Sequence, residues 1–273
     1  MKLQFTKMHG LGNDFVLINA IGQEVPLLAP FCKTYSDRRF GIGFDQALIL
    51  RSSKRADFKM EIFNADGSQV EMCGNGIRCL AKYIWDRGLS VKRELTIETL
   101  AGIIRPVKEG DLIQVDMGEP IFDAPSIPVN LEGEVRGYPL KALDREFLIT
   151  CVSMGNPHAV IFVEDLQSFP LEKYGPVIEN HPLFPKRINV EFVRVTDRGN
   201  IYVRVWERGA GETLACGTGA CASAVATYVN GLADRKVIVH LAGGDLLIHW
   251  SDKDHHVYMT GPAVEVYNGE VTL

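Results

Sequence analysis

The sequence lacks several features that would direct it to particular classes of protein. It has no block of lysine or arginine, and no apolar stretch near the roughly 18 residues that a membrane span requires. Without a basic block, nucleic acid is not expected as a partner, because clustered positive side chains neutralise phosphates. Without an apolar stretch, at the N-terminus or elsewhere, we expect no membrane association and a cytoplasmic location.

The sequence has six cysteines, and their spacing argues against two common uses of cysteine. A chain of 273 residues can bury a core without disulfide bonds, and a reducing compartment would not keep such bonds. No CxxC pair occurs, so the cysteines lack the spacing of zinc ligands and we expect no metal site.

Two of the cysteines nevertheless lie in similar surroundings. Cys73 and Cys216 each precede a Gly-x-Gly segment and a run that reads as a helix, in EMCGNGIRCLAKYIW and TLACGTGACASAVATYV. The separation of these two cysteines, here called the repeat offset, also relates without a gap Asn13 to Asn156, Gln46 to Asn189, Asn64 to Glu207, Gly74 to Gly217, Gly76 to Gly219, and Gly12 to Gly155. Such self-similarity predicts an internal duplication and two similar domains.

Short β-rich runs outnumber the helical segments. Strands are expected near residues 14–19, 47–50, 111–117, 159–163, 190–195, 201–206, 237–241 and 256–261, and helices after each cysteine motif and near 30–40 and 171–181. Residues 220–229 are small and apolar on every face, which is typical of a helix buried all round. We therefore predict an α+β fold with two pseudo-symmetric domains. Each would be a mostly antiparallel sheet or barrel around a central helix, with the active site in the interdomain cleft.

The repeated thiols indicate acid–base chemistry. A helix N-terminus offers unpaired N–H groups to an anion and lowers the pKa of a thiol, from about 8.5 toward roughly 3.5 to 7.5. If both motifs face one substrate carboxylate, one sulfur would lie on each side of its α-carbon. One thiolate could then remove the α-proton while the other thiol returns a proton from the opposite side, without any cofactor.

Other residues have both a functional and a structural interpretation. His158 and Glu207 are candidates to relay protons to the sulfurs, and Arg208 is a candidate to bind a second carboxylate. The asparagines and Gln46 fit a polar substrate pocket, although turn formation is the usual role of asparagine. The remaining cysteines are interpreted as small buried hydrophobes: Cys32, Cys79, Cys151 and Cys221.

Five motifs, in order along the chain, closely resemble the diaminopimelate epimerase family. They are KMHGLGNDF, GIGFDQ, FNADGSQVEMCGNGIRC, MGNPH and ERGAGETLACGTGAC. The resemblance implies a cofactor-independent isomerase, usually a homodimer, that interconverts L,L- and meso-diaminopimelate in lysine and peptidoglycan synthesis. It also implies that the last residues rejoin the first domain, which would comprise 1–117 plus 263–273, with the second domain at 118–262.

The resemblance also implies a role for each matching residue. Cys73 would be the proton donor and Cys216 the acceptor in the L,L to meso direction, with His158 and Glu207 adjusting the thiols. The N–H groups that hold the reacting carboxylate would come from Gly74, Asn75, Gly217 and Thr218. The residues that read the amino groups and the distal end would be Asn13, Gln46, Asn64, Asn156, Asn189, Glu207 and Arg208.

Several alternatives remain at this point. A proline racemase or hydroxyproline epimerase would use the same two thiols, but a proline ring has no second polar end for Arg208 to bind. Phenazine-pathway isomerases share the fold that the resemblance implies, but lack the paired cysteines. GTGACA at 217–222 weakly matches a dinucleotide-binding motif, without the acidic residue expected after the next strand. A binding protein that only clamps an amino acid would not need cysteine at both helix starts.

Overall fold

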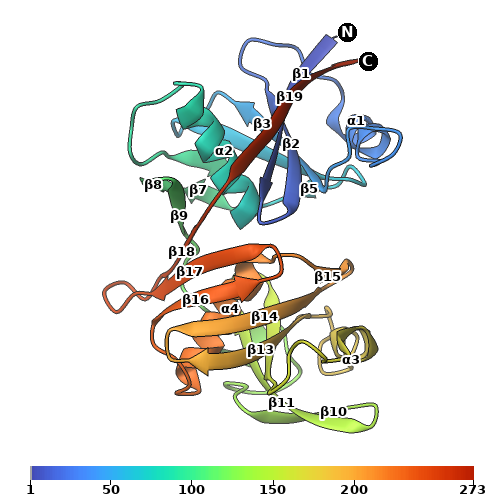
Figure 1. Ribbon diagram of the computed structural model, residues 1–273, viewed down its shortest axis with the longest axis vertical. Coiled ribbons are helices and arrows are strands. Elements are labelled where there is room, and N and C mark those ends of the chain that lie inside the picture. Colours follow the sequence, from blue (N-terminus) through green and yellow to red (C-terminus); the bar gives the residue numbers. More distant parts are fainter. Residues whose placement is uncertain (1) are drawn as a thin grey trace. The chain divides into compact units, whose positions relative to one another are not determined.

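The computed structural model describes residues 2–273, which divide into two compact units (Figure 1). The first unit runs to Asp116 and resumes at Thr260, and the second spans Met117–Met259. These units are defined by contacts within the chain. The domain limits expected from the family resemblance, 1–117 plus 263–273 and 118–262, stay a prediction.

The first unit is a sheet of short strands that packs against one long helix. Its sheet has the order β19-β1-β2-β3-β4-β6-β7, with β5 paired to β4, and only β2–β3 and β4–β6 are parallel among these strands. Helix α2 contacts β1, β2, β3, β9 and β19. The elements are β1 (Lys2–Gly10), β2 (Asn13–Asn19), α1 (Leu28–Tyr35), β3 (Gln46–Arg51), β4 (Phe58–Asn64), β5 (Gln69–Val70), α2 (Gly74–Asp86), β6 (Ile97–Thr99), β7 (Gly102–Ile104), β8 (Val107–Glu109), β9 (Leu112–Asp116) and β19 (Val264–Thr272).

The second unit repeats this plan around helix α4. Its strands follow the order β10-β11-β12-β13-β14-β16-β17-β18, with β15 paired to β14, and α4 contacts six of them, from β11 to β17. Within Gly217–Thr227 every residue of α4 except Thr218 is buried, which confirms the helix buried all round. The elements are η1 (Ala124–Ser126), β10 (Tyr138–Ala142), β11 (Arg145–Ser153), β12 (Pro157–Phe162), α3 (Leu171–Glu179), β13 (Asn189–Asp197), β14 (Asn200–Glu207), β15 (Gly211–Thr213), α4 (Gly217–Val229), β16 (Lys236–Leu241), β17 (Gly244–Trp250) and β18 (Val257–Gly261).

The internal duplication predicted from the repeat offset is confirmed. Strands β1 and β11 are related by that offset at both of their ends, and so are helices α2 and α4. The parallel pair β2–β3 joins Phe15 to Gln46, and its counterpart β12–β13 joins His158 to Asn189 at the same offset. The predicted α+β class with two similar, mostly antiparallel halves is therefore correct.

The structure adds strands that the sequence patterns did not indicate, among them β1, β4, β10, β11, β17 and β19. Strand β19 lies beside β1 and pairs with it from Lys2–Thr272 to His9–Val264 (Figure 1). Glycine is uncommon inside a strand, and packing explains Gly269 in β19. A Cβ at this position would lie 2.4 Å from the ring of Phe5.

Candidate active site

In the first unit, Cys73 is the N-cap residue of α2, with extended φ and ψ of −141° and 116°. Its Sγ accepts a hydrogen bond of 3.4 Å from the N–H of Gly76, in the first helical turn. The extended backbone of Cys73 and this bond hold the thiol at the helix start, where unpaired N–H groups are available to an anion.

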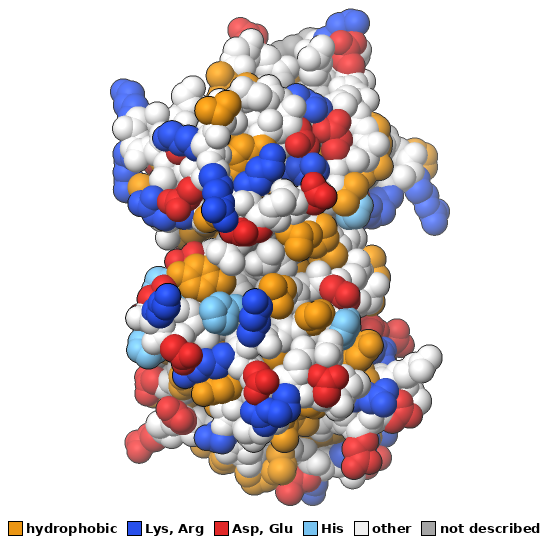
Figure 2. All heavy atoms as spheres, turned by 60° about the vertical axis from the view of Figure 1, so that its left-hand side comes forward, with side chains coloured by type: hydrophobic (Ala, Val, Ile, Leu, Met, Phe, Trp, Pro, Cys, Tyr) orange, Lys and Arg blue, Asp and Glu red, His pale blue; other side chains and the backbone are white. Residues whose placement is uncertain are grey.

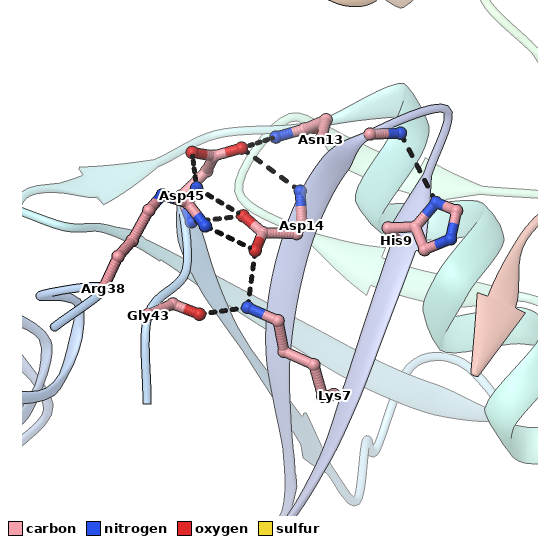
Figure 3. Close-up of polar contacts among 8 residues, drawn as sticks. Lys7, His9, Asn13, Asp14, Arg38, Gly43 and Asp45 are labelled. Atoms are coloured by element: carbon pink, nitrogen blue, oxygen red, sulfur yellow. Dashed lines mark hydrogen bonds and ion pairs between the residues drawn. The ribbon is translucent and has the colours of Figure 1, made fainter. Parts of the chain in front are cut away.

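The side chain of Asn13 lies against this thiol. The Sγ of Cys73 donates to Oδ1 of Asn13 at 3.7 Å, and Nδ2 of Asn75 donates to the same oxygen at 3.2 Å. The amide nitrogen of Asn13 donates to Oδ2 of Asp45 at 3.0 Å (Figure 3). Since a carboxylate only accepts, Asp45 fixes the amide with its oxygen toward Cys73.

Asp45 belongs to a network of charges (Figure 3). Arg38 donates to Asp45 and to both carboxylate oxygens of Asp14, at 2.8 Å in each case. Lys7 donates to Asp14 at 2.5 Å and also to the carbonyl oxygen of Gly43. Burial alone would raise the pKa of Asp14, but hydrogen bonds from Arg38 and Lys7 outweigh it and lower the pKa to about 2.

Gln46 and Asn64 form a second polar pair in the first unit. Nε2 of Gln46 donates to Oδ1 of Asn64 at 2.9 Å, and Nδ2 of Asn64 donates to Ser68 at 3.0 Å. Oε1 of Gln46 is buried and has no hydrogen-bond partner within residues 2–273. An unpaired buried acceptor of this kind suits an ammonium group of a ligand.

Arg78 is fully buried in α2 beneath these groups. Its guanidinium donates to Oδ1 of Asn75 at 2.9 Å, to the carbonyl of Gly74 at 3.2 Å and to that of Pro262 at 3.2 Å. It therefore holds both the Cys73 turn and the orientation of Asn75.

In the second unit, Cys216 is the N-cap residue of α4, with φ and ψ of −116° and 115°. Its Sγ lies 3.5 Å from Oγ1 of Thr218, and only 6% of the residue is exposed. Burial, followed by the charges of Glu207 and Glu191, raises the pKa of this thiol well above its usual value. The expectation that the helix start lowers the pKa is wrong for Cys216, because desolvation and two nearby carboxylates outweigh the helix N–H groups.

His158 connects two side chains near this thiol. Its Nδ1 lies 2.7 Å from Oε1 of Glu191, and its Nε2 lies 2.9 Å from Oδ1 of Asn156. Neither His158 nor Glu191 is exposed. Burial raises the pKa of Glu191 although the neighbouring His158 opposes the shift.

Glu207 and Arg208 lie at the end of β14, beside Asn189 at the start of the neighbouring strand β13. Thr213 donates to Glu207 at 2.6 Å, and the backbone N–H of Arg208 donates to Oδ1 of Asn189 at 2.9 Å. Nδ2 of Asn189 donates to the carbonyl of Pro157 at 2.8 Å. Asn189 thus ties the segments that carry Asn156 and Arg208, with both ends of its amide engaged.

The four cysteines interpreted as hydrophobes are all buried, which confirms that interpretation. Burial raises the pKa of Cys32 to about 11 and that of Cys79 to about 12. Cys151 is shifted in the same direction by burial and by the charge of Glu191, so its pKa is also raised. Among the described residues, Cys73 and Cys216 are the cysteines that cap helices.

Comparison with known proteins identifies the family of this chain. A sequence profile described as diaminopimelate epimerase matches residues 5–122 and 150–266. The chain is 56% identical to the diaminopimelate epimerase of Acetivibrio thermocellus, with 99% of each chain covered, and 53% identical to that of Moorella thermoacetica, with 99% of this chain and 100% of the relative covered. The chain belongs to the diaminopimelate epimerase family. The resemblance inferred from the five motifs is therefore confirmed, and with it the assignment of the chain as an isomerase.

Solved structures of lower identity share the fold. A phenazine biosynthesis protein of the PhzF family from Bacillus anthracis has a TM-score of 0.73 at 19% identity, with both chains fully covered. A hydroxyproline epimerase from Agrobacterium vitis has a TM-score of 0.68 at 13% identity, covering 100% of this chain and 93% of the other. These structures have the two-domain fold predicted here.

In the first unit, hydrogen bonds join Cys73, Asn13 and Asn75, and a separate bond joins Gln46 to Asn64. In the second unit, contacts join Asn156 to His158, Asn189 to Arg208 and Cys216 to Thr218, and the charge of Glu207 acts on Cys216. Gly74 and Gly217 begin the two helices. Sequence reasoning missed three charged residues that hold these groups: Asp45, which is exposed, and Arg78 and Glu191, which are buried. Arg78 had a visible signal, an arginine in the apolar stretch that follows the first cysteine motif.

Proposed function

We propose that this protein interconverts L,L- and meso-diaminopimelate without a cofactor, in lysine and peptidoglycan synthesis, with Cys73 and Cys216 as the two acid–base groups. The observation that carries the proposal is the pair of helices α2 and α4, which are related by the internal repeat and both capped by cysteine. A duplicated thiol at a helix start fits a reaction that removes a proton from one face of a carbon and delivers a different proton to the opposite face.

In the proposed reaction, the Cα–H bond breaks and its proton passes to one thiolate, which becomes a thiol. The electron pair left on Cα is spread into the adjoining carboxylate. That carboxylate would be held by N–H groups of the two helix starts, from Gly74, Asn75, Gly217 and Thr218. The other thiol then gives its proton to the opposite face of Cα and becomes a thiolate, so that the configuration is inverted.

The proposed direction makes Cys73 the donor and Cys216 the acceptor from L,L to meso. The Oδ1 of Asn13, which accepts from the Cys73 thiol, supports a protonated Cys73. Cys216 has a raised pKa, so its thiolate is a strong base once formed. An incoming ammonium group of the substrate would offset the charge of Glu207 and so favour the Cys216 thiolate. His158 and Glu207 are proposed to adjust the pKa values of the two thiols.

The remaining polar residues are proposed to recognise the ends of the substrate. Oε1 of Gln46 provides an acceptor for an amino group, with Asn13 and Asn64 beside it. Arg208, Asn156 and Asn189 would serve the distal, unreacting end, where the Arg208 guanidinium suits a carboxylate.

We also propose a cytoplasmic homodimer that binds neither nucleic acid nor membrane. Apolar side chains of β19, Val264, Val266 and Tyr267, are 41%, 55% and 44% exposed on a strand at the edge of its sheet, which supports contact with a second copy. Positive and negative side chains are interspersed on the face drawn in Figure 2. Among residues 2–273, no helix is long and apolar enough to cross a membrane. Light scattering after gel filtration tests the dimer.

The decisive experiment incubates the reduced protein with L,L-diaminopimelate in heavy water and follows α-deuterium and configuration by NMR. We expect deuterium in the inverted product from wild type, and none above background from Cys73→Ala or Cys216→Ala. Cys32→Ala, which removes a buried thiol in α1, is the matched control and should stay active. Turnover of proline with no exchange in diaminopimelate would overturn the proposal in favour of a proline racemase.

A further inference from the structure

The internal repeat differs in chemistry at one buried pair of positions. The second unit has His158 and Glu191 there, and the repeat offset places Phe15 and Leu48 at the equivalent positions of the first unit. All four residues are fully buried. Replacing an apolar pair by two ionisable groups in the same buried place costs stability, so the polar pair calls for a functional reason.

The two pairs occupy the same place beneath the capped helices. A Cβ added to Gly76 would lie 3.0 Å from Cδ2 of Leu48, and one added to Gly219 would lie 2.8 Å from Oε1 of Glu191. The second position would also lie 3.4 Å from Sγ of Cys216. The Glu191 carboxyl group therefore packs against the first turn of α4, beside the thiol that caps it.

The partners of His158 determine where its protons lie. Nε2 faces the amide oxygen of Asn156, which only accepts, so Nε2 carries a hydrogen. A second proton lies between Nδ1 and Oε1 of Glu191, across 2.7 Å. Oε2 of Glu191 has no hydrogen-bond partner within residues 2–273, and burial raises the pKa of this carboxyl group. Both facts support retention of that proton.

The orientation of Asn156 follows from this arrangement. Its oxygen is held by His158, and its half-buried side chain makes no hydrogen bond through Nδ2 to any part of the chain that the structure describes. Asn13, at the equivalent position of the repeat, is held the other way, with its nitrogen on Asp45 and its oxygen toward Cys73. The two asparagines thus present opposite groups, an acceptor from Asn13 and a donor from Asn156.

We propose that Glu191 is a positioning residue for the epimerisation: through His158 it holds Asn156 so that Nδ2 donates to a carboxylate of the substrate. This proposal rests on the proposed function. A proton that stays between Glu191 and Nδ1 keeps the hydrogen on Nε2, which in turn keeps the Asn156 oxygen turned away from the substrate. Leu48 and Phe15 have no such role, because Asp45 orients the asparagine of the first unit.

The test compares Glu191→Leu, Glu191→Gln, His158→Phe and the double variant His158→Phe/Glu191→Leu, which has the pair found in the first unit. We expect Glu191→Leu to raise KM for L,L-diaminopimelate about 10- to 100-fold, the effect of losing a hydrogen bond to a charged group, with a smaller change in kcat, since Glu191 also lies beside Cys216. Glu191→Gln should restore KM to within about threefold of wild type, since its amide nitrogen donates to Nδ1 and leaves the hydrogen on Nε2.

The double variant tests whether Glu191 acts through His158. If it does, the double variant will have the same KM as His158→Phe alone, and thermal unfolding should show it folded because the first unit packs the same pair. Additive effects on KM, an unchanged KM in Glu191→Leu, or a Glu191→Gln variant no better than Glu191→Leu would each overturn the proposal.

A nitrogen-15 NMR spectrum of the wild-type imidazole provides a readout independent of activity. We expect a His158 signal with a hydrogen on Nε2, absent from His158→Phe, and a ring protonated only on Nδ1 would overturn the proposal. If the Nε2 hydrogen is present but wild type does not epimerise diaminopimelate, the proposed function fails and this role for Glu191 fails with it. If wild type is active and the Nε2 hydrogen is missing, only the role of Glu191 fails.

Discussion

Asp45 accepts a hydrogen bond of 3.0 Å from the amide nitrogen of Asn13, and this bond leaves the Asn13 oxygen facing the thiol of Cys73. We expect Asp45→Ala to lower kcat/KM for L,L-diaminopimelate about tenfold, because the amide loses the partner that fixes its orientation. Asp45→Asn should retain most of the activity, since its amide oxygen still accepts from Asn13. The control is Asp111→Ala, at an exposed carboxylate between β8 and β9. Equal rates for Asp45→Ala and the control would contradict this role.

The charge of Glu207 contributes to the raised pKa of Cys216, after burial. Glu207→Gln removes that charge, so a larger fraction of Cys216 will be thiolate at a given pH. We expect iodoacetamide to alkylate Cys216 about three- to tenfold faster in this variant at about pH 8, as followed by peptide mass spectrometry. Glu164→Gln, at an exposed position of the same unit, should leave the rate unchanged. A slower reaction in Glu207→Gln would show that the carboxylate assists ionisation of the thiol.

The network around Asp14 makes stability depend on acid. Hydrogen bonds from Arg38 and Lys7 outweigh burial and hold the pKa of Asp14 in the folded protein at about 2, against a usual value of 3.8. A lowered folded pKa contributes stability that is fully present above the unfolded value and is lost as the pH falls toward the folded value. The free energy of unfolding of wild type should therefore exceed that of Asp14→Asn at about pH 5, and the difference should shrink by about pH 2.5. Urea unfolding at the two pH values measures it, and a constant difference would contradict the assignment.

Gly76 and Gly219 occupy the same turn of their helices but have different neighbours. Alanine is a better helix former than glycine by about 1 kcal/mol, which favours both substitutions. At Gly76 the new methyl group meets the terminal methyl group Cδ2 of Leu48 at 3.0 Å, whereas at Gly219 it meets Oε1 of Glu191 at 2.8 Å. We expect Gly219→Ala to lower both the thermal unfolding temperature and kcat/KM, and Gly76→Ala to lower the unfolding temperature little. Equal changes in unfolding temperature would mean that Glu191 moves aside without cost.

The architecture could be predicted from the sequence because equivalent residues of the two halves are separated by a constant offset. Cys73 and Cys216 identified the repeat, and the helix limits of α2 and α4 then agree at both ends. The strands β1 and β11 were harder to recognise, since they carry charged residues such as Lys7 and Arg145 within or at the end of an otherwise apolar pattern. Their equivalence is visible only once both are paired in sheets.

The supporting groups of the site could not be read from the sequence. Glu191 lies in the apolar run of residues 190–195, where a single carboxylate is usually interpreted as solvent-facing. Its contact with His158 depends on the parallel pairing of β12 and β13, which brings together two segments distant in the chain. The pKa of Cys216 was mispredicted for a related reason, because the helix start is local in sequence whereas burial and the two carboxylates depend on the tertiary structure.

The pairing of β19 with β1 has a consequence for the order in which the chain folds during synthesis. Every residue of the second unit has been made once the ribosome passes Met259, but Lys2 pairs with Thr272 and so waits until that residue has also been added. The half that is translated first is therefore the half that is completed last, and until then the outer edge of β1 stays without its partner strand, a surface on which a nascent chain can pair wrongly.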